Sequence, residues 1–136
     1  MLRFANVKVE PKQGDTFSLM LYFKCDTPDL AQFDSPAKIE RTVKASSEKY
    51  LSGAVEKTIK LKKLAPNGRY GYYTVLTDAS LAGNTKLEPG EFKYIIRGMI
   101  RLSEDSALAF SLMTNDLGSA EHKELVEYIL SFAKPK

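Results

Sequence analysis

Apolar residues recur at every second position over residues 16–24. One face of this stretch carries Phe17, Leu19, Leu21 and Phe23. A period of two over that length predicts a β-strand with one buried face. Residues 2–9 alternate in a similar way, and Pro11 and Gly14 supply turn chemistry between the two stretches. The chain is therefore expected to begin with two strands.

Four more stretches have the composition and alternation of strands. They span Val55–Leu64, Arg69–Thr77, Phe92–Leu102 and Ala107–Asn115. Pro66-Asn67-Gly68 predicts a tight turn after the first of them, and Ser103–Ser106 predicts a short turn between the last two. Short turns between consecutive strands favour an antiparallel sheet.

Two helices are also expected. Serine suits the N-cap and proline the first helical position, so Ser35-Pro36 predicts the start of a helix over residues 36–52, which Gly53 would end. The second helix, over residues 120–132, follows Gly118-Ser119. Both helices have apolar residues near helical spacing, so each should bury one side.

The predicted order is two strands, a helix, four strands and a helix. Such a chain folds as an α+β protein, with an antiparallel β-sheet flanked by helices in an αβα sandwich. At 136 residues the chain has the length of a single domain, 1–136. That length allows a real core without disulfides or metals.

Composition limits the partners and the compartment. Twenty cations against seventeen anions give a net charge of +3, which is too balanced to indicate nucleic acid. Cys25 is the only cysteine, so no intramolecular disulfide can form. No apolar run approaches the roughly 20 residues of a membrane span. No signal peptide is visible, and a strand predicted almost at Met1 favours an exported or periplasmic protein whose signal has been removed, with a cytoplasmic protein as the alternative.

Several short motifs accompany this order of elements. They are the Phe17-Ser18-Leu19 strand, the Ser35-Pro36 helix start, Arg69-Tyr70-Gly71-Tyr72-Tyr73, and the closing Ile129-Leu130-Ser131-Phe132. In these features the chain resembles the PsbP-like proteins, named for an extrinsic subunit of photosystem II. The resemblance implies a fold shared with a Ran-binding nuclear import factor and with uncharacterised bacterial proteins. It also implies a binding or accessory role, although a fold alone assigns no function.

The sequence offers little for catalysis. It has one histidine, His122, and one cysteine, far apart, so no metal and no other cofactor is expected. No spacing supports a Ser/His/Asp or Cys/His triad, and no glycine-rich loop indicates a phosphate site. No catalytic residue is therefore assigned. His122, in the first turn of the last helix, is expected to be exposed.

Polar residues should gather at one edge of the predicted sheet. The strand 69–77 ends there, the loop 78–91 returns the chain to the next strand, and the strand 107–115 ends at the same edge. This rim carries Asp78, Glu88, Glu91, Asn115 and Asp116. Because long loops are often functional, cation binding at the rim is one hypothesis, and turn capping with solubilising charge is the other.

A second candidate site is one face of the strand 92–102. Its apolar face carries Phe92, Tyr94, Ile96, Gly98, Ile100 and Leu102. The opposite face carries Lys93, Arg97 and Arg101. The neighbouring strand adds one of two sets, depending on a register that the sequence does not reveal: Arg69 with Tyr73, or Tyr70 with Tyr72.

Arginines beside tyrosines can hold an anion or an acidic partner. The alternatives are a solvated face of long side chains, or a helix over the face with Arg97 paired to an acidic residue. The favoured function is a non-catalytic binding or accessory domain that docks a protein partner or a small anionic ligand. The alternative is a small hydrolase or lyase that uses carboxylates of the 78–91 loop.

Overall fold

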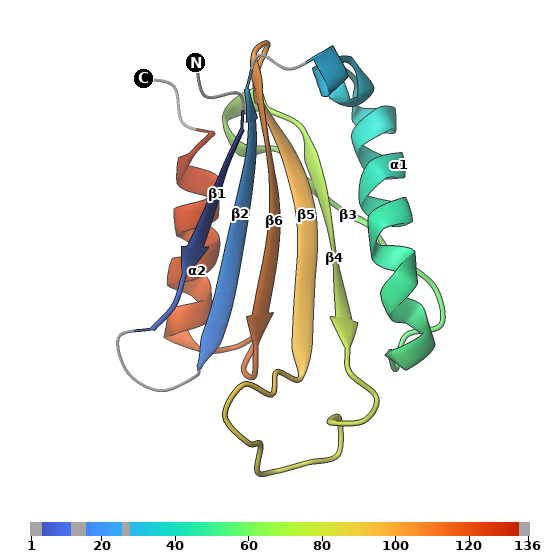
Figure 1. The fold of residues 1–136 in the computed structure, drawn as a ribbon, viewed down its shortest axis with the longest axis vertical. Helices are drawn as coiled ribbons and strands as arrows, with labels where there is room; N and C mark the ends of the chain where they lie inside the picture. Colours follow the sequence, from blue (N-terminus) through green and yellow to red (C-terminus); the bar gives the residue numbers. More distant parts are fainter. Residues whose placement is uncertain (1–3, 12–15, 26–27, 134–136) are drawn as a thin grey trace.

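A six-stranded sheet forms the middle of the molecule (Figure 1). The computed structural model describes residues 4–11, 16–25 and 28–133. The strands are β1 (Phe4–Val9), β2 (Phe17–Cys25), β3 (Lys62–Leu64), β4 (Gly71–Thr77), β5 (Tyr94–Ser103) and β6 (Ser106–Thr114). Their order is β1-β2-β6-β5-β4-β3, and every neighbouring pair is antiparallel. The predicted α+β class with an antiparallel sheet is confirmed.

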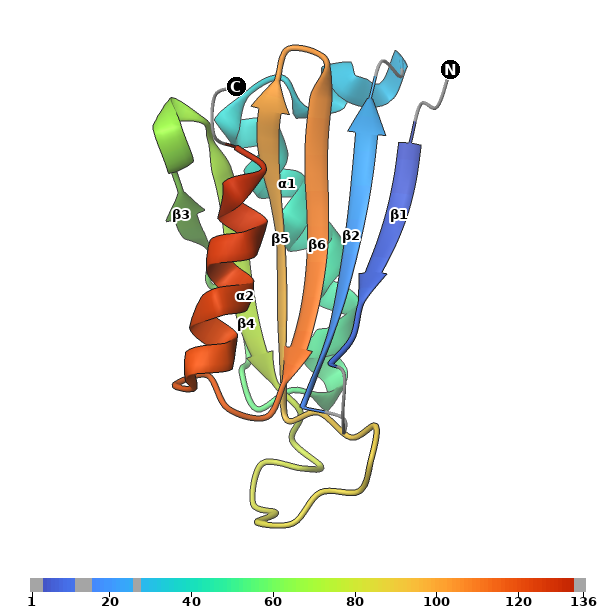
Figure 2. The ribbon, with the colours of Figure 1, turned by 90° about the vertical axis from the view of Figure 1, so that its left-hand side faces the viewer.

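One helix packs on each face of the sheet. The helix α1 (Pro36–Ser47) lies on one side and α2 (Ala120–Ser131) on the other (Figures 1 and 2). Ser35 caps α1 as predicted, since its Oγ accepts a hydrogen bond from the backbone N–H of Lys38 at 3.2 Å. Ser119 caps α2 in the same way. Within the described residues, neither helix is long and apolar enough to cross a membrane.

The prediction of one helix over residues 36–52 is wrong at its C-terminal end. The α-helix ends at Ser47, and the chain continues as a 3₁₀ helix over Glu48–Gly53. The chain then joins the sheet edge, where the N–H of Val55 donates to the carbonyl of Thr77 at 2.8 Å. The tighter 3₁₀ turn redirects the backbone toward that edge, so tertiary contact overrides the local preference for an α-helix.

The predicted strand over residues 55–64 is wrong over most of its length. Only Lys62–Leu64 pairs with β4, and the Val55 side chain is 49% exposed. Before β3, the Glu56 carboxylate accepts hydrogen bonds from the Thr77 N–H at 2.6 Å and the Thr77 hydroxyl at 2.9 Å. A side chain therefore fills the edge positions that a paired strand would occupy.

The other predicted strands differ from the observed ones only at their ends. Residues 2 and 3 of the first predicted strand, and Gly14 of the turn that follows it, lie outside the described residues.

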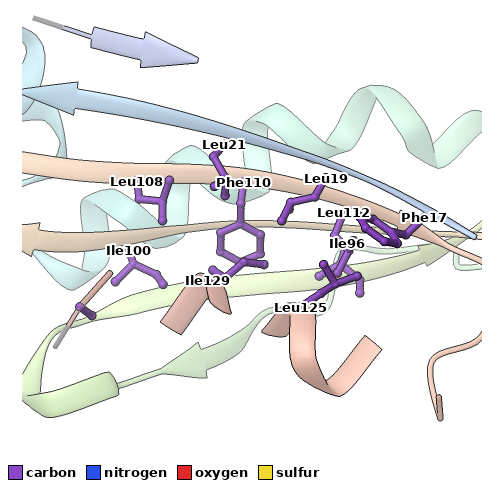
Figure 3. Packing of buried hydrophobic residues seen from close by; sticks show 11 residues of the cluster. Phe17, Leu19, Leu21, Ile96, Ile100, Leu108, Phe110, Leu112, Leu125 and Ile129 are labelled. Carbon is purple, nitrogen blue, oxygen red and sulfur yellow. The ribbon is translucent and has the colours of Figure 1, made fainter. Parts of the chain in front are cut away.

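The larger core lies between the sheet and α2 (Figure 3). The apolar face predicted for β2 is buried here, with Leu19 and Leu21 both fully inaccessible. Burying a leucine side chain contributes about 1.5–3 kcal/mol. Gly98 is needed in this layer, because a Cβ at that position would lie 2.4 Å from the ring of Phe110. The missing side chain lets this ring lie across β5.

The second core lies under α1 and is smaller. It contains Leu30, Phe33, Ile39, Val43, Tyr72, Met99 and Ala107. The helix α1 packs over β4 and β5. The same face of β2 is less covered, and Tyr22 is 38% exposed. The α1 side of β2 is therefore more open to solvent than the α1 side of β4 and β5.

Candidate functional site

The two arginines of β5 point to the α1 side of the sheet. Ile96 and Ile100, between them in the alternation, point into the α2-side core. The α1 face is therefore not the open, solvated face considered from the sequence, because a helix lies over part of it. Lys93 stands apart from the two arginines, just before β5 begins, where the loop 78–91 meets the sheet.

Arg101 is held by backbone carbonyl groups. Its Nε donates to the carbonyl of Ser103 at 2.7 Å, and its Nη1 donates to that of Leu30 at 2.8 Å. Its Nη2 donates to the carbonyl of Glu104 at 2.5 Å. All three nitrogens have partners, so Arg101 ties the β5–β6 hairpin to the 3₁₀ helix Pro28–Phe33 and has no free edge for a ligand.

Arg97 has a different environment. Its Nη1 donates to the Tyr50 hydroxyl at 3.3 Å and to the Ser111 hydroxyl at 3.5 Å, both at the long end of the range for hydrogen bonds. The guanidinium carbon lies 5.0 Å from the centre of the Tyr50 ring, within the range of a cation–π contact. No carboxylate of the described residues forms an ion pair with it. Pairing with an acidic residue, one alternative raised from the sequence, does not occur among the described residues.

The other edge of the Arg97 guanidinium has no hydrogen-bond partner among the described residues. Its Nε is buried without a hydrogen bond, and Nη2 makes none with the described residues. Nε and Nη2 together form an edge that can bind a carboxylate through two parallel hydrogen bonds. An unsatisfied buried donor costs about 1–3 kcal/mol. The protein therefore keeps a cation with free donors at an energetic cost.

A small cavity of about 40 Å³ adjoins this arginine. Its lining consists of Tyr22, Thr42, Val43, Ser46, Arg97, Gly98, Met99, Ala109, Phe110 and Ser111. None of these residues is acidic, so no neighbour in the lining neutralises the arginine. A water molecule takes up about 30 Å³ in the liquid, so the cavity has room for a small polar head group and no more.

The register between β4 and β5 settles which residues of β4 share the Arg97 face. Tyr72 is buried in the α1-side core, and the Tyr70 hydroxyl donates to the carbonyl of Phe33 at 3.4 Å. Tyr73 belongs to the α2-side core instead. Arg69 is exposed and precedes β4. Tyr70 and Tyr72 therefore lie on the α1 side, but Tyr50, from the 3₁₀ helix after α1, is the tyrosine that contacts Arg97.

Carboxylates of the predicted rim cap turns of their own loops. Asp78 accepts hydrogen bonds from the N–H and the hydroxyl of Ser80 at 2.9 and 2.6 Å. Glu91 accepts one from the backbone N–H of Glu88 at 2.7 Å. Asp116 accepts one from the N–H of Gly118 at 2.9 Å, before α2 begins. These contacts favour the turn-capping interpretation of the rim.

Asn115 connects the loop 78–91 to the end of β6. Its Oδ1 accepts from the backbone N–H of Lys93 at 2.7 Å, and its Nδ2 donates to the carbonyl of Glu91 at 3.0 Å. Part of the predicted rim is therefore brought together in space. In the part of the chain that the structure describes, no group of three or more His, Cys, Asp or Glu side chains is arranged to hold a metal ion.

A wider cavity of about 350 Å³ lies near this rim, on the α1 side. Lys49, Tyr50, Asp78 and Lys93 are among its lining residues. The Lys93 ammonium donates to the carbonyl of Asn84 at 3.0 Å, and Lys49 lies 5.3 Å from the centre of the Tyr50 ring. Tyr50 therefore lines this cavity and also contacts Arg97, which lines the smaller one.

The expectation that His122 is exposed is wrong. The residue is half-buried, and its Nδ1 atom is buried without a hydrogen bond. The reason is helical spacing: His122, Leu125 and Ile129 lie three and four residues apart, so they share the face of α2 that packs on the sheet. That spacing is visible in the sequence and was the signal for its position.

The sequence interpretation missed Tyr50 and Ser111 as neighbours of Arg97. From the sequence, Tyr50 belongs to the predicted helix over residues 36–52, and nothing in the pattern connects it to Arg97. Its contact with Arg97 joins positions 47 residues apart and depends on the 3₁₀ turn after α1. Ser111 lies opposite Arg97 in the pairing of β5 with β6. The predicted turn Ser103–Ser106 indicates that the two strands pair. It does not give the register, because the pairing has an irregularity between Arg101 and Ser103.

No protein-family model matches the sequence, and no curated protein matches it either. Solved structures with a similar arrangement of elements include the following two. One is a Pseudomonas aeruginosa protein of unknown function, PA94, described as a putative regulator, with a TM-score of 0.49, 12% identity, and coverage of 98% of this chain and 83% of that chain. The other is the cyanobacterial PsbP (CyanoP) of Synechocystis sp. PCC 6803, with a TM-score of 0.39, 10% identity, and coverage of 96% and 78%. At these identities and TM-scores, the two likenesses concern the arrangement of helices and strands alone.

Proposed function

We propose that this chain is a non-catalytic binding domain that docks a protein partner through an acidic side chain placed on Arg97. The observation that carries the proposal is the free Nε–Nη2 edge of this half-buried guanidinium, which has no carboxylate partner among the described residues. An aspartate or glutamate from a partner supplies the two acceptors that this edge lacks, once the arginine side chain shifts to expose Nε, which is buried in the unbound protein.

The size of the cavity favours a protein partner over a small ligand at this position. Pockets that enclose small molecules usually measure about 300–1,000 Å³. The space beside Arg97 is about 40 Å³, so it takes a carboxylate group but not a whole ligand. The rest of the partner lies beside α1, on the open side of β2, where Tyr22 is 38% exposed and lines the same cavity. Tyrosine and arginine are both enriched at protein interfaces.

Two of the three carboxylates of the 78–91 loop are engaged in hydrogen bonds, which weighs against the hydrolase or lyase alternative. Asp78 and Glu91 accept hydrogen bonds from the backbone of their own loop, and the only histidine lies on α2. A general acid or base needs a free carboxyl group within reach of a substrate proton. The acid–base alternative is therefore not proposed.

Selection of peptides from a random peptide library tests the proposal. The chain should enrich peptides that contain aspartate or glutamate. Calorimetry on one enriched peptide should show that Arg97→Gln weakens binding by about 1.5–3 kcal/mol, the contribution of hydrogen bonds to a charged group. Arg97→Lys should recover only part of the loss, because an ammonium lacks the planar two-donor edge. Arg41→Gln, an exposed arginine on α1, is the matched control and should leave the affinity unchanged.

Two results count against this proposal. Enriched peptides without acidic residues, or an affinity unaffected by Arg97→Gln, would exclude Arg97 as the docking point. A small-anion site would behave differently, because it would use the 350 Å³ cavity, which has the size of a small-molecule pocket and is lined by Lys49 and Lys93. In that case free acetate or phosphate should bind without any peptide, and Lys49→Gln should reduce the affinity while Arg97→Gln does not.

A further inference from the structure

The opposite face of the sheet contains a cavity of about 300 Å³ beneath α2. Its lining consists of Leu64, Tyr73, Val75, Ile96, Phe110, Leu112, Leu117, His122, Val126, Ile129 and Leu130. Nine of these eleven residues are apolar, and Tyr73 and His122 carry the polar groups. The cavity is reachable from outside, because Leu117 is 38% exposed and Val126 and Leu130 are only half-buried.

Each of the two polar residues of the lining has a polar atom without a hydrogen bond to the described residues. The Nδ1 atom of His122 is buried and has no hydrogen bond, and the Tyr73 hydroxyl makes none with a described residue. Burial lowers the pKa of His122, although the charge of Asp116 acts to raise it, so the imidazole is neutral at pH 7. A neutral imidazole has one donor and one acceptor nitrogen. An uncharged ligand suits this cavity, since an anion would be repelled by Asp116.

We propose that this cavity binds an uncharged, apolar molecule of about two fused rings that carries one hydroxyl group. The size follows from the volume, because apolar protein cavities of about 150 Å³ hold one benzene ring, and this cavity is about twice as large. The hydroxyl group follows from the unpaired His122 nitrogen, with Tyr73 as a second possible partner. Ligand pockets in general are mostly apolar with a few polar groups that fix orientation. The site is on the other face of the sheet from Arg97 and does not depend on the function proposed above.

The test compares 1-naphthol with naphthalene, which has the same rings and no hydroxyl group. Calorimetry on the full chain should show one 1-naphthol bound per chain, about 2- to 12-fold more tightly than naphthalene, the range expected for one hydrogen bond. In His122→Leu the ratio of the affinities for 1-naphthol and naphthalene should fall toward one, while naphthalene still binds. The helix cap is kept in this variant, because the Ser119 hydroxyl oxygen accepts a hydrogen bond from the backbone N–H of residue 122, which the substitution does not change.

Val126→Phe fills the cavity from α2 and should abolish binding of both probes. Lys123→Ala changes an exposed residue of the same helix and should leave both affinities unchanged. Thermal melts show whether each variant is folded, and His122→Leu provides an independent readout if Val126→Phe does not fold. No binding of either probe, equal affinity for the two, or binding that survives Val126→Phe in a folded protein would each overturn the proposal. Concentration-dependent dimerisation that Val126→Phe abolishes would also overturn it, because the groove would then be covered by a second copy.

Discussion

Replacing Arg97 by methionine should leave the protein about as stable as before, or make it more stable. Methionine keeps most of the length of the side chain but removes the charge and its donors. The losses are two long hydrogen bonds to Tyr50 and Ser111 and a cation–π contact of about 0.5–2 kcal/mol. The gain is removal of the buried, unpaired Nε, which costs about 1–3 kcal/mol. If each of the two long hydrogen bonds contributes no more than about 0.5 kcal/mol, the expected change in the free energy of unfolding lies between about −2 and +2.5 kcal/mol, centred near zero.

Arg101 is the matched control, because it lies on the same face of the same strand. Its three nitrogens all donate to backbone carbonyls, and Arg101→Met would leave those carbonyls without their partner. That change should destabilise the protein by about 2–4 kcal/mol, with allowance for carbonyls that water can reach. Urea denaturation of the three proteins, followed by circular dichroism, measures the difference. If Arg97→Met destabilises the protein as much as Arg101→Met, Arg97 is a structural residue and the reasoning for a binding site fails.

Three further predictions concern the rest of the molecule. Gly98→Ala should destabilise the protein by about 1–3 kcal/mol, because the new Cβ would lie 2.4 Å from the Phe110 ring and 2.8 Å from the Tyr72 carbonyl oxygen. Gly83→Ala is the control: no atom lies within 4 Å of the new Cβ, so the stability in the same urea assay should be nearly unchanged. Burial acts to raise the pKa of Glu56, but its hydrogen bonds from Thr77 outweigh this and lower the pKa below 4.5. The contribution of Glu56 to stability is therefore present above that pH and lost as the pH falls through the folded-state pKa. Urea melts at a series of acidic pH values should show that Glu56→Gln loses less stability with falling pH than the wild type, and an identical loss in the two proteins would contradict this. EDTA should leave the melting temperature unchanged in calorimetry, since no set of metal ligands occurs among the described residues, and a fall of several degrees would show a bound ion.

The fold could be predicted largely from alternation, because burial of one face fixes which side each residue of a strand takes. Leu19 and Leu21 follow this rule, and Arg97 takes the opposite face from Ile96 as the period of two requires. The rule failed at Val55–Leu64, where the same alternation occurs but Glu56 occupies the sheet edge with its side chain. Alternation shows that a stretch can be a strand, but it does not show whether an unpaired edge is available to it.

The candidate site was less predictable than the fold. The sequence placed Arg97 and Arg101 together, and it could not tell that one is satisfied by three carbonyls while the other keeps a free edge. That difference depends on where the 3₁₀ helix Pro28–Phe33 and the residue Tyr50 come to lie, which is decided by packing across long sequence separations. His122 is the opposite case, since its position on the buried face of α2 follows from local helical spacing.

The two faces of β6 explain why Arg97 has a free edge. Toward α2 the strand carries large residues, Leu108, Phe110 and Leu112, which fill the main core. Toward α1 it carries Ala107, Ala109 and Ser111, whose short side chains fill little of the space between the helix and β2. A leucine in place of Ala109 would fill the cavity that Ala109 lines and would shield the arginine. Small residues beside an unpaired, half-buried cation are costly for the fold on its own. The same arrangement is favourable once a partner's carboxylate fills the space, and for this reason the α1 side of β5 and β6 is the surface on which we expect a partner to dock.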